Sequence, residues 1–218
     1  MPKTNILILA AGYNKISDKP CSLWVFDNGK SILDWQINAF EAVLPNSGIN
    51  IAIGYDYQRI ISNYPNYSFR YVFDWAKKSA LQSFLTITSE HPRHTLVMYG
   101  DTIFHPDTLV KFNNIESDIV IAVDSVWKKR FLDRSKKDIE LAETLDTESY
   151  EKVEYTGLVK FSPKVMEWIL ENKENYNTKK NFIDLFDDLK IAGFKIKNFD
   201  VSGNWAEMNE PNDLVQFI

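Results

Sequence analysis

Three small residues follow a run of large apolar residues near the start of the chain. Residues 6–9 are Ile, Leu, Ile and Leu, and Ala10, Ala11 and Gly12 come next. A run that is apolar on both faces predicts a strand covered on both sides. The small residues let the backbone turn and approach another group, and free N–H groups in such a turn suit a phosphate. The turn matches neither the G-x-G-x-x-G pattern nor the P-loop pattern, so it supports neither of those sites.

A carboxylate occupies a comparable place later in the chain. Residues 95–99 form another apolar run, which stops abruptly at Gly100 and Asp101. In open α/β sheets, ligands bind at the carboxyl ends of strands, so Asp101 is a candidate site residue. The alternative is an aspartate that caps a helix or closes a turn.

The opening motifs occur in an order that resembles a known family. Leu9-Ala-Ala-Gly12 is followed by Lys19-Pro20 and by a second hydrophobic patch at residues 28–33. This order resembles the nucleotidyltransferases that join NTPs to phosphorylated sugars or alcohols. In that family a Gly-Asp at the place of Gly100 and Asp101 holds magnesium on the NTP phosphates. The resemblance implies a set of nucleotide-binding residues around this turn: Leu9, Ala10, Ala11, Gly12, Tyr13 and Gly100.

The end of the chain resembles the terminal segment of the same family. Residues 203–214 follow its pattern of Trp-x-Glu, a hydrophobic residue, Asp or Asn, and a short turn. In a strand, Glu207 and Asn209 point to one face, so both could reach one cation. Mg²⁺ prefers such oxygen ligands and usually takes few from the protein. The resemblance implies Asp101 and Asn209 as metal ligands with Glu207 nearby; the alternative is that Asn209 caps a final helix.

Two middle segments resemble the phosphocholine-cytidylyltransferase-like branch of the family. Residues 73–84 are similar to its base-proximal segment, which implies that Ser79 and Ser83 bind nucleotide. Residues 124–134, Ala142-Glu143 and 154–157 are similar to its acceptor side. The resemblance implies a set of acceptor-binding residues from these segments and the terminal one: Trp127, Arg134, Glu154, Tyr155, Gly157, Trp205 and Glu207.

The phosphate loop departs from the family pattern. The family carries an arginine in this loop and a lysine after the proline, whereas this chain has Lys15 and Lys19 before Pro20 and Cys21 after it. We expect Lys15 and Lys19 to replace these charges and to act with Asp101 in catalysis. Lysine offers a flexible point charge in place of the planar fork of arginine.

Strands and helices alternate along the chain in a pattern that positions these residues. Strands are expected at 49–55, 69–73, 119–123 and 194–201, and helices between them. Ser31 and Ser79 are expected to cap two of these helices. This alternation predicts an α/β, Rossmann-like, mostly parallel sheet with helices on both faces. Residues 140–145 and 152–161 are expected to be strands of a small antiparallel insertion spanning 124–162, and 211–217 a closing helix. We expect a single domain over residues 1–218.

Composition restricts the class of protein. The 218 residues carry a formal net charge of -5, which argues against a nucleic-acid surface. No apolar run is long enough to insert into a membrane. With one cysteine an internal disulfide is impossible, so a reducing, cytoplasmic compartment is expected. Either a monomer or a homodimer is compatible with the sequence.

The resemblance implies transfer of an NMP from an NTP to a phosphorylated or phosphonylated small molecule, with release of pyrophosphate and Mg²⁺ as cofactor. The cytidylyltransferase-like segments favour CTP and transfer of CMP, for use in capsule or surface-polysaccharide biosynthesis. One alternative is a sugar-1-phosphate nucleotidyltransferase that uses another NTP. The other is a degenerate nucleotide-binding protein without turnover, which the altered loop would favour.

Overall fold

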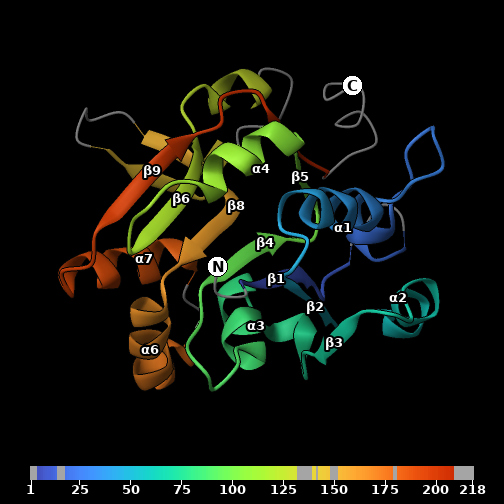
Figure 1. Ribbon diagram of the computed structural model, residues 1–218, viewed down its shortest axis with the longest axis horizontal. Helices are drawn as coiled ribbons and strands as arrows, with labels where there is room; N and C mark the ends of the chain where they lie inside the picture. The colour runs from blue at the N-terminus through green and yellow to red at the C-terminus, as the bar shows by residue number, and fades with distance from the viewer. Residues whose placement is uncertain are drawn as a thin grey trace.

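A single mixed sheet organises the molecule (Figure 1). The computed structural model describes residues 4–13, 18–131, 139–140, 142–147, 152–178 and 181–208. The strands of the main sheet, in spatial order, are β3 (Ser68–Tyr71), β2 (Gly48–Ile53), β1 (Asn5–Ala10), β4 (Thr95–Tyr99), β8 (Lys152–Phe161), β6 (Ile119–Asp124) and β9 (Ile196–Asp200). A short strand, β7 (Thr144–Asp146), pairs with β8, and β5 (Thr102–Phe104) forms a separate two-stranded sheet with β10 (Trp205–Glu207).

The sheet is parallel except around β8. Strands β3, β2, β1 and β4 run parallel to one another, as do β6 and β9. Strand β8 runs antiparallel between β4 and β6. The predicted fold class is therefore confirmed. The strand at 152–161 was expected in a small insertion but lies inside the main sheet. All of its residues except the exposed Lys152 are buried or half-buried.

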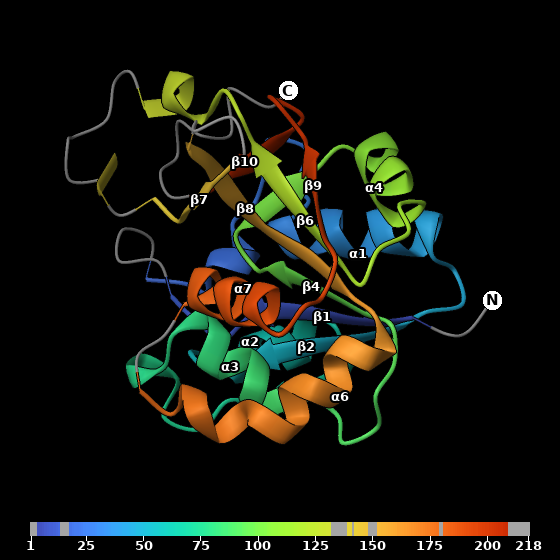
Figure 2. The same cartoon turned by 90° about the vertical axis from the view of Figure 1, so that its left-hand side faces the viewer.

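Helices cover both faces of the sheet (Figures 1 and 2). The helices are α1 (Ile32–Val43), α2 (Tyr57–Asn63), α3 (Ala80–Ile87), α4 (Pro106–Asn113), α6 (Pro163–Asn172) and α7 (Phe182–Ile191), with 3-10 turns at Cys21–Leu23, Trp75–Lys77, Trp127–Phe131 and Lys173–Tyr176. Helices α3, α6 and α7 pack in one apolar cluster with Leu7 of β1. Helices α1 and α4 pack in the other with Ile6 and Ile8. Alternate side chains of β1 thus enter opposite cores, as a run apolar on both faces predicts.

Local capping fixes the helix starts. The Ser31 hydroxyl accepts the Asp34 N–H, and the Asp34 side chain accepts the Ser31 N–H. Ser79 and Gln82 make the same reciprocal pair at the start of α3. Such capping boxes satisfy N–H groups that the helix leaves without partners. Both predicted caps are confirmed.

One expected element begins later than predicted, and another lies outside the described residues. The strand expected over 140–145 begins at Thr144, because Ile139 and Glu140 are helical. The helix expected over 211–217 lies outside the described residues. None of the helices in the described part of the chain is long and apolar enough to cross a membrane.

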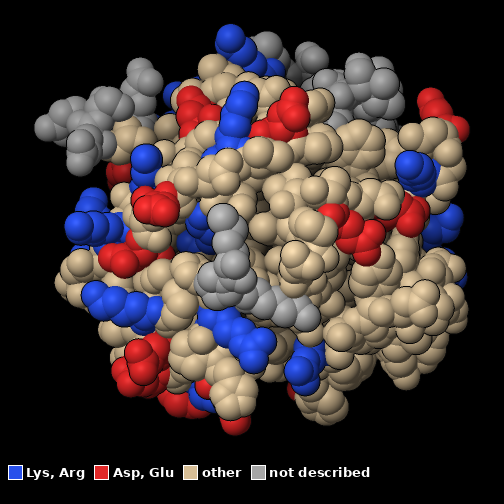
Figure 3. All heavy atoms as spheres, viewed as in Figure 1, with Lys and Arg blue, Asp and Glu red and all other residues tan. Residues whose placement is uncertain are grey.

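The surface mixes both signs of charge. Figure 3 shows Lys and Arg side chains interspersed with Asp and Glu over much of one face, and a mostly uncharged area over α2 and β3. This face therefore lacks the uniformly basic area that nucleic-acid surfaces present.

Candidate active site at the carboxyl ends of β1 and β4

The small-residue turn and Asp101 lie side by side because β1 and β4 are parallel neighbours. Leu9 pairs with Tyr99, and the Gly100 N–H donates to the Leu9 carbonyl at 3.0 Å. A Cβ on Gly100 would lie 2.8 Å from both Ala10 Cα and the Leu9 oxygen. Only glycine permits this approach, so Gly100 brings the two strand ends together. Gly12, at the open side of the turn, is exposed.

Strand β10 brings Glu207 to the same place. It pairs antiparallel with β5, with Glu207 opposite Thr102. The Met208 N–H then donates to the Asp101 carbonyl at 2.8 Å. The fully buried Gln36 holds the turn between β4 and β5 through its side-chain NH₂, which donates to the carbonyls of Tyr99 and Thr102 at 2.8 and 2.6 Å. The sequence did not single out Gln36, since a lone amide on a helix looks like any polar residue.

The Asp101 carboxylate is in an unfavourable electrostatic position. Its Oδ1 atom is buried and has no hydrogen-bond partner among the described residues. Burial, with repulsion from Glu207 and a smaller effect of Glu143, raises the pKa of Asp101 to about 7. A buried carboxylate beside like charges is the arrangement that a cation relieves.

Glu143 also belongs to this acidic group, although it is not among the site residues expected from the sequence. The Tyr99 hydroxyl donates to its carboxylate at 2.7 Å. Burial raises the pKa of Glu143, the Tyr99 hydrogen bond opposes this, and Glu207 and Asp184 add repulsion. The sequence signal was its place in the acceptor-side segment with Ala142, but only the path of residues 142–147 brings it to Tyr99, close enough to influence Asp101.

The predicted acceptor-side residues are largely buried. The indole N–H of Trp205 donates to Asp124 at 2.9 Å, and that of Trp127 to the Lys152 carbonyl at 3.0 Å. Tyr155 packs edge-on against Phe186 with ring centres 5.2 Å apart. Its hydroxyl is buried without a hydrogen-bond partner among the described residues. These side chains lie around the carboxyl end of β6 and the amino end of the antiparallel β8.

Two further acceptor-side positions lie on β8. Glu154 is almost fully buried and stands opposite Asp124 across the β6–β8 pair. Gly157 has a φ of 78°, and a Cβ there would lie 2.7 Å from the Tyr99 ring. Gly157 therefore lets β8 pass close to Tyr99, directly before Gly100 and Asp101.

Ser79 and Ser83 both belong to the start of α3. The Ser79 hydroxyl caps the helix, and the Ser83 hydroxyl donates to the Ser79 carbonyl at 3.0 Å. Their predicted contact with nucleotide stays a prediction beside these structural bonds. Tyr13 is 43% exposed and contacts the Trp75 ring at 5.9 Å, so the small-residue turn and the segment before Ser79 share one rim.

The basic residues of the loop are less completely described. Lys19 is exposed, and the neighbouring Cys21 thiol is partly buried. Burial, followed by the Asp101 carboxylate, raises the pKa of Cys21 to about 12. Three predicted site residues, Lys15, Arg134 and Asn209, lie outside the described residues.

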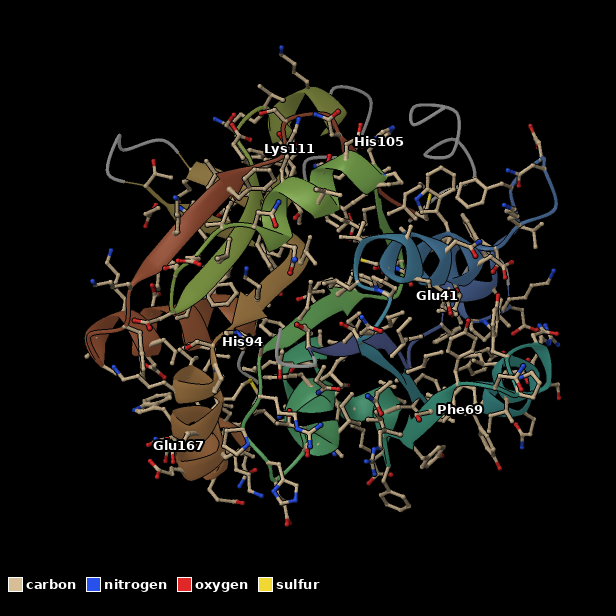
Figure 4. The ribbon with its side chains drawn as sticks, viewed as in Figure 1. Glu41, Phe69, His94, His105, Lys111 and Glu167 are labelled. Carbon is tan, nitrogen blue, oxygen red and sulfur yellow. The ribbon has the colours of Figure 1, made fainter. Side chains whose placement is uncertain are left out.

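Within the described ranges, no group of three or more His, Cys, Asp or Glu side chains is placed to hold a metal ion. The histidines do not gather either. Figure 4 shows His94 ahead of β4 and His105 at the start of α4, where its ring nitrogen accepts the Asp107 N–H at 3.3 Å.

The chain is similar to known proteins in structure but not detectably in sequence. No family model matches the chain, and no curated protein matches it in sequence. Solved structures do match over nearly the whole length. An inositol-1-phosphate CTP transferase from T. maritima has a TM-score of 0.66 at 17% identity, with 98% of this chain and 92% of that chain covered.

Two further structures agree with it. A CTP:phosphocholine cytidylyltransferase from Streptococcus pneumoniae has a TM-score of 0.68 at 13% identity, covering 98% of this chain and 97% of that one. A 4-diphosphocytidyl-2C-methyl-D-erythritol synthase from Anaerococcus prevotii has a TM-score of 0.66 at 14% identity, covering 98% and 95%. The structural neighbours thus agree with the resemblance found in the motifs: this chain has the fold of solved nucleotidyltransferases.

Proposed function

We propose that this protein is a nucleotidyltransferase that transfers an NMP from an NTP to a phosphorylated or phosphonylated small molecule and releases pyrophosphate. The observation that carries the proposal is the juxtaposition of the open Ala10–Gly12 turn with the buried Asp101 carboxylate and with Glu207. Backbone N–H groups and paired carboxylates at one sheet edge are suited to a nucleoside triphosphate and its counter-ion.

The reaction needs positioning more than covalent chemistry. An acceptor oxygen attacks the α-phosphorus of the NTP, a new P–O bond forms, and the bond to the β-phosphate oxygen breaks so that pyrophosphate leaves. The turn at Ala10–Gly12 binds phosphate oxygens, and Lys19, with Lys15, neutralises the departing pyrophosphate. Glu154, Tyr155 and Gly157 border the acceptor.

The residues present fit a magnesium ion. Asp101 has a buried oxygen without a partner among the described residues and is repelled by Glu207, so the site carries excess negative charge. Asp101 and Asn209 would hold the ion, with Glu207 close by. When bound, Mg²⁺ supplies charge neutralisation to the triphosphate.

CTP is the favoured nucleotide and a small phosphorylated alcohol or amine the favoured acceptor. Support comes from the segments 73–84 and 124–134 and from the neighbours whose names specify CTP. Acceptors of this kind would place the product in capsule or surface-polysaccharide synthesis.

The test is pyrophosphate release with Mg²⁺, across four NTPs and a panel of phosphorylated acceptors. We expect release with CTP and one acceptor class, and a loss of at least about 100-fold in kcat/KM for Asp101→Asn, by analogy with other charge-stabilising groups. Asp107→Asn, an exposed carboxylate on α4, is the matched control and should retain activity.

Three outcomes would contradict parts of the proposal. Release with a different NTP would overturn the preference for CTP. Saturable NTP binding without release, with any acceptor, would favour a binding protein without turnover. Equal activity of Asp101→Asn and wild type would overturn the assignment of Asp101.

A further inference from the structure

An aromatic cluster lies beside the small-residue turn. The rings of Tyr13 and Tyr55 are 5.0 Å apart, those of Tyr55 and Trp75 are 5.5 Å apart, and those of Tyr13 and Trp75 are 5.9 Å apart. The three residues come from three separate segments: the end of the turn after β1, the loop after β2 and the loop after β3. They therefore tie three strand ends together at the sheet edge that holds Asp101.

Glycine at position 54 permits this cluster. A Cβ on Gly54 would lie 2.6 Å from both the Ala11 carbonyl oxygen and Trp75 Cγ. The Tyr55 N–H donates to that same Ala11 carbonyl at 2.9 Å. The indole of Trp75 thus packs directly against Gly54, and the Tyr55 backbone is hydrogen-bonded to the turn.

Tyr55 also reaches the far end of the same loop. Its hydroxyl donates to the Asp18 carboxylate at 2.6 Å. One side chain therefore contacts Tyr13 with its ring and Asp18 with its hydroxyl. Asp18 directly precedes Lys19, the described basic residue of the loop.

The backbone is strained at this rim. Among the described residues, the non-glycine residues with positive φ are Asp18, Asp56 and Asp74, at 47°, 44° and 54°. Each is adjacent to the cluster: Asp56 follows Tyr55, Asp74 precedes Trp75, and Asp18 bonds Tyr55. Left-handed backbone costs energy in residues other than glycine and persists where surrounding contacts impose it.

We propose that Tyr55 is a positioning residue that fixes the phosphate loop by both described ends, setting the turn at Gly12 through Tyr13 and setting Lys19 through Asp18. The inference rests on the proposed function, in which Lys19 faces the pyrophosphate part of the NTP. Within the described residues, the side chain of Tyr55 contacts Tyr13, Trp75 and Asp18 rather than Asp101. Its effect is to hold Tyr13 and Lys19 in place before a triphosphate binds.

The position predicts a selective effect on triphosphates. Tyr55→Phe keeps the ring contacts with Tyr13 and Trp75 and removes only the bond to Asp18. Loss of this bond removes the contact that holds Asp18, and with it Lys19, to the cluster, so we expect CTP to bind about 5–20-fold more weakly. CMP lacks the pyrophosphate part and should bind within about 2-fold of wild type. Isothermal titration of CTP and CMP with Mg²⁺ measures both.

A second tyrosine–carboxylate hydrogen bond provides a matched control. The Tyr67 hydroxyl donates to the Glu41 carboxylate at 2.7 Å, an exposed bond of the same chemistry, but Tyr67 lies just before β3, at the opposite edge. Figure 4 shows Glu41 on α1. Tyr67→Phe should leave CTP and CMP affinities unchanged, and both variants should unfold in urea with similar free energies.

A double-mutant cycle with Asp18→Ala completes the test. If the two groups act through one bond, the loss of CTP affinity in Tyr55→Phe, Asp18→Ala and the double variant should be the same. Additive losses, unchanged CTP affinity in Tyr55→Phe, or an equal loss for CMP would overturn the inference while the proposed function stands. A wild type that binds no NTP would overturn both.

Discussion

At the residue scale, Cys21 shows what burial does to a reactive group. Burial of its thiol, followed by repulsion from the Asp101 and Glu207 carboxylates, raises its pKa to about 12. The thiolate is the nucleophilic form, and a raised pKa keeps Cys21 protonated, so its thiol is expected to be unreactive. The position after Pro20, where the family pattern that this chain resembles has a lysine, is therefore occupied by a neutral group, and Lys19 is the nearest described basic residue in sequence.

We expect native Cys21 to react slowly with a thiol reagent. At pH 8 its alkylation by iodoacetamide should be at least about 100-fold slower than in urea-unfolded protein, because an ordinary thiol with a pKa near 8.5 is far more ionised. Since Cys21 is the single cysteine in the chain, mass spectrometry reports its rate directly. Equal native and unfolded rates would show that the thiol is neither buried nor influenced by the carboxylates.

At the element scale, the passage of β8 past Tyr99 depends on Gly157. We expect Gly157→Ala to lower the free energy of unfolding by about 2–4 kcal/mol, because a Cβ there meets both an unfavourable φ and the Tyr99 ring. Gly193→Ala is the control: its φ is 86° but no atom lies within 4 Å of the added Cβ. It should cost only about 1 kcal/mol. Urea unfolding measures both, and equal losses would mean that the Tyr99 contact contributes nothing.

The same elements show which parts of the structure are predictable from sequence. Helices α1 and α3 are predictable because Ser31 and Ser79 start them through contacts three residues away. The neighbourhood of Asp101 and the small-residue turn follows from two buried parallel strands. In contrast, β8 has the length and apolar content of a central strand, yet no local signal gives its direction or its neighbours.

Contacts that depend on loop paths were not predictable. Glu143 meets Tyr99 across 44 residues of sequence, and Tyr55 meets Asp18 across 37. Neither pair has a periodicity or a motif, since each is formed when the fold brings loop ends together. The strand expected from residue 140 was likewise placed too early, because apolar content there did not distinguish a strand from a helical turn.

At the scale of the whole molecule, the acidic site carries a stability cost that depends on pH. Asp101 and Glu143 both have raised pKa values, so the folded chain keeps protons that the unfolded chain releases. The free energy of unfolding should therefore fall as pH rises from about 4 to about 7, in the absence of metal. Asp101→Asn removes the ionisable group and with it part of this loss.

We expect metal-free Asp101→Asn to match wild type near pH 4.5 and to be more stable by about 1–3 kcal/mol at pH 8. Urea unfolding in EDTA at the two pH values measures the difference. Asp107→Asn, which changes an exposed carboxylate, should show no such pH dependence. An identical difference at both pH values would place the Asp101 side chain in a solvent-like environment.

The antiparallel course of β8 also has a consequence for synthesis on the ribosome. Strands β1 to β4 emerge early and can assemble as a parallel block, but the free edge of β4 has no partner until Lys152–Phe161 has been made. Strand β6 likewise lacks its β8 partner until this segment has been made. Nascent chains therefore expose a hydrophobic sheet edge while the intervening residues are translated, and such edges favour association with other chains. A slow translation step before residue 152 would prolong this exposure, whereas rapid delivery of β8 would close both edges at once.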